Sequence, residues 1–190
     1  MLKKITLTIG ASFLLVGCLS GTSTIREIDP KDIVHLEDRY DSHDLEQQAA
    51  NMVQSLLREK IIIDNPTPKI MLGKIVVDDS VDEHIDVHLI QQTIQHNLIK
   101  SKRADFVDVE NIKVLEQQID YQNNSKYIKN PNAKGHFVAP RYMLSGRISK
   151  IMVSDGSMKD VTYKLLLQLT DIKTNLIAWK QIDTVAKRVK

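Results

Sequence analysis

The sequence predicts an α/β (α+β) fold: a single mainly antiparallel sheet flanked by helices and ending in a three-strand meander. Two observations support this prediction. Apolar residues recur at helical spacing in three segments before residue 120, whereas the last 50 residues alternate between apolar and polar positions and contain two turn signals. The helical segments alternate with short β-branched runs, so we expect the helices to pack against the sheet that the strands form.

The first predicted helix begins at Asp44, which we expect to cap it, with Gln47 as the capping-box partner three residues later. The helix ends before Asn65-Pro66-Thr67-Pro68, because proline cannot continue a helix. Its apolar residues fall on one stripe, which we expect to face the core: Leu45, Ala49, Met52, Val53, Leu56 and Leu57.

Lys69–Val77 is β-branched and apolar on both faces, which predicts a central strand. Residues 78–83 predict an acidic loop, and a second amphipathic helix is expected from about Asp86 to Lys102. The apolar residues that mark this helix are Val87, Leu89, Ile90, Ile94 and Leu98.

A short strand is predicted at residues 106–109, and a third helix is marked by Ile112, Leu115 and Ile119. Residues 123–140 are polar and contain three residues that break regular structure, which predicts a loop. The meander then consists of strands at 142–153, 161–169 and 176–185, separated by turns at Asp155-Gly156 and at 171–175. Five residues share one face of its middle strand: Val161, Tyr163, Leu165, Leu167 and Leu169.

The N-terminus predicts export as a bacterial lipoprotein. Lys3 and Lys4 precede Ile5–Val16, twelve uncharged and mostly apolar residues. That run is shorter than the roughly 20 residues of a membrane-spanning helix and has the length of a signal-peptide core. Leu15-Val16-Gly17-Cys18 resembles a lipobox, in which the cysteine thiol receives diacylglycerol and the new amino terminus is acylated.

We therefore expect residues 1–17 to be a lipoprotein signal peptide, Cys18 to be the lipidated residue, 18–43 to be a tether and 44–190 to be one periplasmic globular domain. An uncleaved membrane helix, or an ordinary signal peptide with a chance cysteine, is the alternative. Cys18 is the only cysteine in the chain, so no internal disulfide is expected. Leu19 and Ser20 follow it without an aspartate, which by resemblance to sorting in enteric bacteria favours the outer membrane.

The composition gives no sign of a nucleic-acid-binding protein or of an enzyme. The net charge is +2, and the basic run Lys187–Lys190 is expected to be a solvated tail. His84 and His88 stand four apart, but Ile85 follows His84, so the zinc-protease pattern is absent. Asp78 and Asp79 are expected to be two solvated acids. Because no nucleophile elbow, phosphate loop or dinucleotide motif is found, we expect no catalytic residues, no metal and no cofactor.

From Ile28 onward the chain resembles the LpoB family of lipoprotein activators of penicillin-binding proteins. The segments that carry the resemblance are 28–30, 44–45, 52–53, 55–57, 73–75, 84–86, 106–108, 140–148 and 160–164, together with Trp179. Their order and spacing behind a lipobox, rather than any single segment, make the combination specific.

The resemblance implies an outer-membrane anchor and a periplasmic α/β domain that docks onto a class A bifunctional penicillin-binding protein. Docking would stimulate polymerisation and cross-linking of peptidoglycan. The alternative is a structural or assembly lipoprotein of a secretion or flagellar apparatus built on the same fold. An enzyme is the third possibility and would require a polar cleft.

Overall fold

The structure is a computed structural model, which describes residues 42–65, 67–82, 85–155 and 158–189 of the 190-residue chain. The chain divides into two compact units, Met1–Val34 and His35–Lys190, and every described residue belongs to the second unit. The expected signal peptide, Cys18 and the expected tether up to Asp41 lie outside the described residues. None of the described helices has the length and apolar character needed to cross a membrane.

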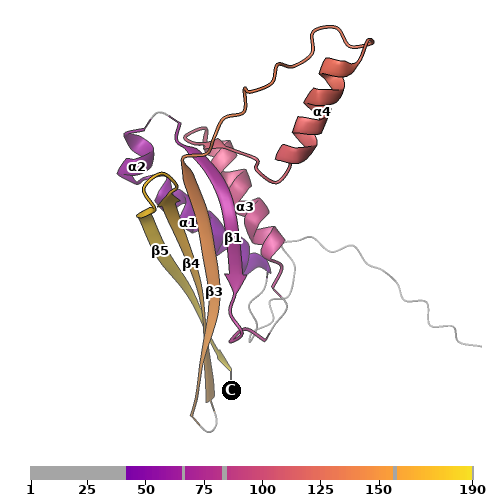
Figure 1. Ribbon diagram of the computed structural model, residues 1–190. Coiled ribbons are helices and arrows are strands. Elements are labelled where there is room, and N and C mark those ends of the chain that lie inside the picture. Colours follow the sequence, from indigo (N-terminus) through magenta and orange to yellow (C-terminus); the bar gives the residue numbers. More distant parts are fainter. Residues whose placement is uncertain (1–41, 66, 83–84, 156–157, 190) are drawn as a thin grey trace, which may run out of the picture. The chain divides into compact units, whose positions relative to one another are not determined.

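The observed elements confirm the predicted α/β class and the predicted order of helices and strands (Figure 1). The first helix, which was predicted to run to just before Asn65, is interrupted: α1 ends at Leu56, and residues 57–59 form a turn. A short second helix, α2, follows and was not predicted. The elements are α1 Ser42–Leu56, α2 Lys60–Ile63, β1 Lys69–Val77, α3 Val87–Ser101, β2 Asp105–Phe106, α4 Ile112–Asn124, β3 Tyr142–Asp155, β4 Met158–Asp171 and β5 Leu176–Val189.

The five strands form one sheet in the order β2-β1-β3-β4-β5. β1 is parallel to both β2 and β3, whereas β3, β4 and β5 pair antiparallel over nearly their full length. The parallel pairs follow from the crossovers through α3 and α4, since parallel neighbours need a long connection. The predicted mainly antiparallel sheet and its terminal meander are therefore confirmed.

The core lies between α1, α3 and one face of the sheet, and the predicted helical stripe of α1 is buried in full. On α3, Ile90, Ile94 and Leu98 are buried, and the five predicted residues of β4 are at most 3% exposed. Successive residues of a strand point to opposite faces, so this alternation leaves the second face of the sheet open to solvent. Figure 1 shows both helices on the same side of the sheet.

The boundaries of α3 match the prediction because both ends are capped locally. The Asp86 carboxylate accepts hydrogen bonds from the backbone N–H groups of His88 (3.0 Å) and Leu89 (3.2 Å). Lys102 ends the helix with φ of 56°, a left-handed conformation that stops the helical repeat.

The predicted start of the first helix at Asp44 is wrong. α1 begins at Ser42, so Asp44 lies within its first turn and does not cap it. Its carboxylate instead pairs with the Lys187 ammonium of β5 at 2.7 Å, and both side chains are mostly buried. The capping pattern of Asp44 and Gln47 therefore placed the helix start two residues too late, and the contact with Lys187 could not be predicted from neighbouring residues.

The basic run at the C-terminus is not a solvated tail, because β5 continues to Val189. Besides the Lys187 pair, Arg188 donates to both carboxylate oxygens of Asp160 at 2.7 and 2.8 Å. These hydrogen bonds hold the pKa of Asp160 below its usual range. β4 therefore supplies the partner that carries the last strand beyond its predicted end at Val185.

The predicted strand at 106–109 is shorter than expected, and the predicted packing of the third helix on the sheet is wrong. Pairing with β1 ends after the Val107 N–H bonds to the Ile70 carbonyl at 2.8 Å. The Asp108 carboxylate then accepts from the N–H groups of Glu110 and Asn111, which turns the chain into α4. No residue of α4 is buried, since its apolar stripe is only three residues long.

Candidate functional site

The single predicted site residue, Cys18, lies outside the described residues, and so does His84 of the histidine pair. His88 is described, and its Nε2 lies 3.0 Å from Nε2 of Gln92 on the exposed surface of α3. Asp78 and Asp82 of the acidic loop form ion pairs with Arg147 and Lys150 of β3, so Asp78 is not simply solvated as predicted. Among the described residues, no group of three or more His, Cys, Asp or Glu side chains is placed to hold a metal ion.

A wide apolar groove lies at the β2 edge of the sheet. It encloses about 690 Å³ and lies between the end of α3, β2, the start of α4 and residues 137–138 of the loop that leads to β3. We call it the edge groove. Eight of its twelve lining residues are apolar, and the remaining four are two lysines and two aspartates. The charges therefore balance, and the apolar surface dominates.

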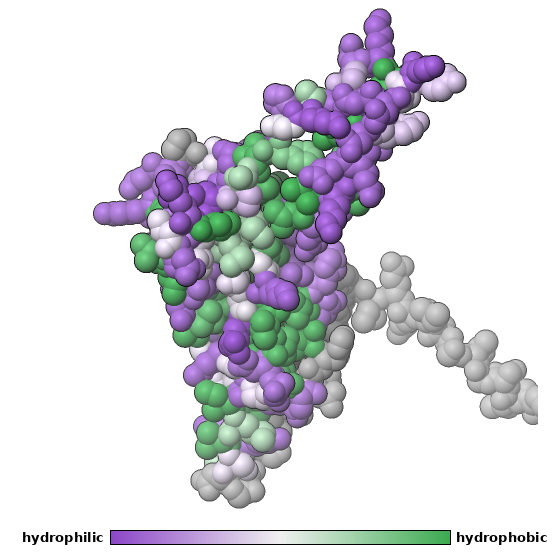
Figure 2. Space-filling view, in the orientation of Figure 1, coloured by the Kyte–Doolittle hydropathy of each residue, from purple (hydrophilic) through white to green (hydrophobic). Residues whose placement is uncertain are grey.

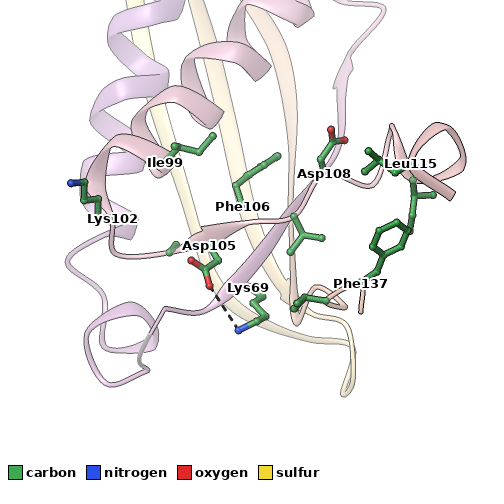
Figure 3. Close-up of a pocket in the computed structure, with 12 residues that line it drawn as sticks. Lys69, Ile99, Lys102, Asp105, Phe106, Asp108, Leu115 and Phe137 are labelled. Carbon is green, nitrogen blue, oxygen red and sulfur yellow. Dashed lines mark ion pairs between the residues drawn. The ribbon is translucent and has the colours of Figure 1, made fainter. Parts of the chain in front are cut away.

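The end of α3 and β2 form the floor and one wall of the edge groove. Ile99 projects from the last turn of α3 and is 57% exposed, while Ala104 is buried at the base. The Ser101 hydroxyl donates to the Leu98 carbonyl at 2.6 Å and accepts from the Arg103 N–H at 3.1 Å, so the turn into β2 is fixed locally. Phe106 then points its ring into the groove from β2 (Figure 3).

The opposite wall comes from α4 and the loop after it. Figure 3 shows Leu115 of α4 beside Phe137, and both residues also line a second, smaller hollow between α4 and the loop. Their exposed fractions are 44% and 45%, so each presents half of its apolar surface to solvent. Figure 2 shows the corresponding apolar surface beside the base of α4. The two residues thus close the groove without being buried themselves.

Polar contacts brace this wall. The Asn123 amide donates to the Ile119 and Asn132 carbonyls, each at 2.8 Å, and the Gln122 side-chain oxygen accepts from the backbone N–H of Asn132 at 3.1 Å. Lys134 pairs with Asp120 at 2.5 Å. We call α4 with residues 125–138 the arm. Because its two sides are tied together by side chains, the arm holds Phe137 in place although it is not packed on the sheet.

The charged residues of the groove lie on its rim. Lys69 pairs with Asp105 at 3.8 Å, and both side chains are largely exposed. The Asn111 amide donates to Asp108 at 2.7 Å, and this bond, with the backbone bonds to the same carboxylate, lowers the pKa of Asp108. Asp108 is therefore ionised near neutral pH, and the hydrogen bonds that its carboxylate accepts stabilise the turn that leads into α4.

An apolar groove with a charged rim is suited to receive apolar side chains of another protein, since such patches mark interaction sites. The sequence prediction missed it. Two signals pointed to it: the apolar pair Phe137-Val138 inside an otherwise polar loop, and a third helix whose stripe is too short to be a core face. Both features can be recognised in the sequence, but only the tertiary structure brings α4 and residues 137–138 next to β2.

Comparison with solved structures finds a likeness to two LpoB C-terminal domains. The domain from Salmonella enterica is 15% identical, with a TM-score of 0.45, and the one from Escherichia coli is 12% identical, with a TM-score of 0.48. Each alignment covers 75% of this chain and 98% of that chain. No curated protein sequence matches this chain.

Comparison with protein families gives a match over residues 44–185 to the family described as peptidoglycan-synthase activator LpoB. The match spans all five strands up to the last residues of β5, and it includes both helices of the core as well as the arm and the edge groove. The resemblance stated from the sequence is thereby confirmed, and the chain belongs to the LpoB family of peptidoglycan-synthase activators.

Proposed function

We propose that this protein is an outer-membrane-anchored lipoprotein whose domain binds a class A penicillin-binding protein and raises its synthase activity. The observation that carries the proposal is the family match, which covers nearly the whole domain from residue 44 to residue 185. The edge groove supports it, because an activator needs a surface for its enzyme and that surface needs no catalytic groups.

The anchor belongs to the same proposal. Residues 1–17 are removed as a signal peptide, Cys18 carries the lipid, and residues 18–43 tether the domain to the outer membrane. Several acyl chains make such an anchor stable, because each buried methylene contributes about 0.8 kcal/mol. Confinement beside the wall then raises the effective concentration of the domain for an enzyme that works there.

Activation follows from binding alone. A ligand shifts a conformational equilibrium by its differential affinity for the two states, so a domain that prefers the active synthase populates it. A tenfold preference corresponds to about 1.4 kcal/mol and requires only a few better contacts in the active state. No proton transfer or covalent step by the lipoprotein is involved.

We propose the edge groove as the docking surface for the synthase. Phe106 and Phe137 offer aromatic surface at the groove, and large aromatic side chains contribute much of the energy of protein interfaces. Phe137 is 45% exposed and Phe106 is partly buried against the core, so a partner can cover what remains exposed of both rings without unfolding the domain. The paired Lys69 and Asp105 on the rim favour an interface with an apolar centre and a polar border.

The test uses the full mature chain, the class A synthases of the same organism and labelled lipid-linked precursor. We expect binding and faster glycan polymerisation or cross-linking with one of the synthases. Leu115→Asp and Phe137→Asp should weaken binding at least tenfold. Val114→Asp is the matched control, since Val114 is 61% exposed on the same helix but does not line the groove.

No binding and no change in activity with any synthase would exclude the activator function and favour an assembly lipoprotein. Binding that Val114→Asp and Phe137→Asp weaken equally would instead place the interface elsewhere. Tether length gives a second test. If the synthase sits in the inner membrane, lengthening residues 18–43 should be tolerated better than shortening them, since the domain must span part of the gap.

A further inference from the structure

The strand β5 forms the edge of the sheet opposite β2, and in the described part of the chain no strand pairs with its outer side (Figure 1). It is 14 residues long, whereas β2 at the other edge has only two residues. Three of its large apolar side chains are exposed: Leu176 at 67%, Ile177 at 54% and Ile182 at 54%. A long edge strand with apolar side chains is a template for pairing with another strand.

The hydrogen-bond pattern identifies which residues of β5 direct their backbone groups outward. The Ile172 N–H donates to the Arg141 carbonyl at 3.0 Å. Because residues of an antiparallel strand bind the neighbours on its two sides alternately, even-numbered residues of β4 bind β3 and odd-numbered ones bind β5. Leu165 lies opposite Asp183, so the odd-numbered residues of β5 bind β4. The even-numbered residues from 180 to 188 therefore direct their N–H and C=O groups away from the sheet.

A side-chain contact on β5 agrees with this assignment. The Thr184 N–H donates to the Asp183 carboxylate at 2.8 Å, as expected for an N–H that does not point toward β4. Within the described ranges, the N–H groups of Lys180 and Ile182 have no hydrogen-bond partner. The edge therefore keeps backbone groups that a further strand can bind.

A second copy of β5 matches these backbone groups. An antiparallel pairing about a two-fold axis at Ile182 places Ile182 opposite Ile182 of the second copy, and Lys180 opposite Thr184 in both directions. Each of these three pairs joins two outward-facing residues, so each can exchange two backbone hydrogen bonds. The pairing extends from Leu176 to Arg188 and so uses nearly the whole strand.

The side chains are also complementary in this register. On the face that the helices cover, Gln181 lies opposite Asp183 of the second copy, so the amide can donate to the carboxylate. On the open face, the exposed Ile182 side chains of the two copies meet at the axis. Arg188 lies opposite Leu176, and no like charges lie opposite each other.

Three of the neighbouring registers bring like charges together. An axis at Lys180 would oppose two lysines, and an axis at Asp183 would oppose two aspartates. An axis at Thr184 would place Lys180 opposite Arg188. Like charges directly opposite each other destabilise a strand pair, so these registers are disfavoured.

Two further registers avoid like charges but lose part of the pairing. An axis at Gln181 would leave the C-terminal end of β5 unpaired, and an axis at Val185 would leave its N-terminal end unpaired. The axis at Val185 would also oppose Asp183 and Lys187, but Lys187 already pairs with Asp44 at 2.7 Å. The axis at Ile182 therefore combines the longest pairing with the absence of like-charge contacts.

We propose that two copies of this chain associate through β5, antiparallel about a two-fold axis at Ile182, so that their sheets become continuous. A single strand pair buries less surface than a standard stable interface, so the dimer is weak and its population depends on concentration. The edge groove of each copy stays open, because it lies at the opposite edge of the sheet. The inference does not depend on the proposed function.

The first test measures molecular mass by sedimentation equilibrium, with the full chain from residue 18 carrying Cys18→Ala, at about 10 μM to 1 mM protein. We expect a reversible dimer. Ile182→Lys, which places two ammonium groups at the axis, should weaken association at least tenfold. Val76→Lys is the matched control, since Val76 is 43% exposed on β1, and should leave association unchanged. A monomer at every concentration, or equal effects of the two substitutions, would overturn the proposal.

The second test determines the register by disulfide formation in the same background, where no other cysteine remains. Opposed residues of an antiparallel pair have Cα atoms about 5.5 Å apart, which a disulfide can span. Ile182→Cys should therefore cross-link to itself. A mixture of Lys180→Cys and Thr184→Cys proteins should form the mixed disulfide at least tenfold faster than either symmetric one. Equal rates for the mixed and symmetric products would show that the copies do not pair in this register and would overturn the proposal.

Discussion

Arg141 and Asp171 join the start of β3 to the end of β4. Nε and Nη2 of Arg141 donate to one oxygen of Asp171 at 2.9 and 2.6 Å, while its other oxygen accepts from the Lys173 and Thr174 N–H groups of the following turn. The hydrogen bonds from Arg141 are the main reason that the pKa of Asp171 is lowered. One carboxylate thus holds a strand pair and a turn together.

This pair predicts a dependence of stability on pH. Because the pKa of Asp171 is lower in the folded state, its contribution is present above the unfolded value of about 3.9 and is lost as pH falls through the folded value. Asp171→Asn should therefore lower the urea midpoint at neutral pH, and the difference from wild type should shrink below about pH 4. Arg141→Gln should flatten the acid limb in the same range, and a curve parallel to wild type would contradict the assignment.

The buried faces predict the cost of two core truncations. Leu56 of α1 and Leu165 of β4 have no exposed surface, so Leu56→Ala and Leu165→Ala should each lower the free energy of unfolding by about 2–5 kcal/mol. Leu176→Ala is the control, because Leu176 is 67% exposed and its truncation should change stability by no more than about 0.5 kcal/mol. Urea unfolding of the three variants measures this, and equal midpoints would show that the faces are misassigned.

Two glycines of the sheet predict unequal effects of the same substitution. A Cβ on Gly146 would lie 2.9 Å from the Leu166 carbonyl oxygen and 2.8 Å from a Leu167 methyl, and the paired backbone cannot retreat. A Cβ on Gly73 would instead meet the flexible Met143 side chain at 2.9 Å. Gly146→Ala should cost about 1–3 kcal/mol and Gly73→Ala clearly less. Thermal unfolding compares them, and a larger loss for Gly73→Ala would refute the argument.

The N-terminal sequence predicts the fate of the anchor. Cys18→Ala removes the thiol that diacylglycerol would modify, so the protein should accumulate as a soluble or uncleaved species. Membrane fractionation of wild type and variant, with mass measurement of the mature wild-type N-terminus, checks this. If the variant still fractionates with the outer membrane as the mature protein, the lipoprotein assignment fails.

The sequence by itself determined which segments are helices and strands wherever one face is buried. The stripe of α1, both ends of α3 and the alternation of β4 follow from periodicity and local caps, and these are properties of neighbouring residues. The lipobox and the family resemblance are local in the same sense, because they depend on the order of residues and not on contacts.

The tertiary structure decided what depends on partners distant in sequence. Asp44 lies in the first turn of α1, which begins at Ser42, and pairs there with Lys187 of β5. The last strand, β5, continues to Val189 beside Asp160 instead of ending as a tail. The arm does not pack on the sheet, because α4 has too few apolar residues to form a buried face. The edge groove likewise exists only after residues as distant in sequence as Lys69 and Val138 meet, and such contacts leave no periodic mark in the chain.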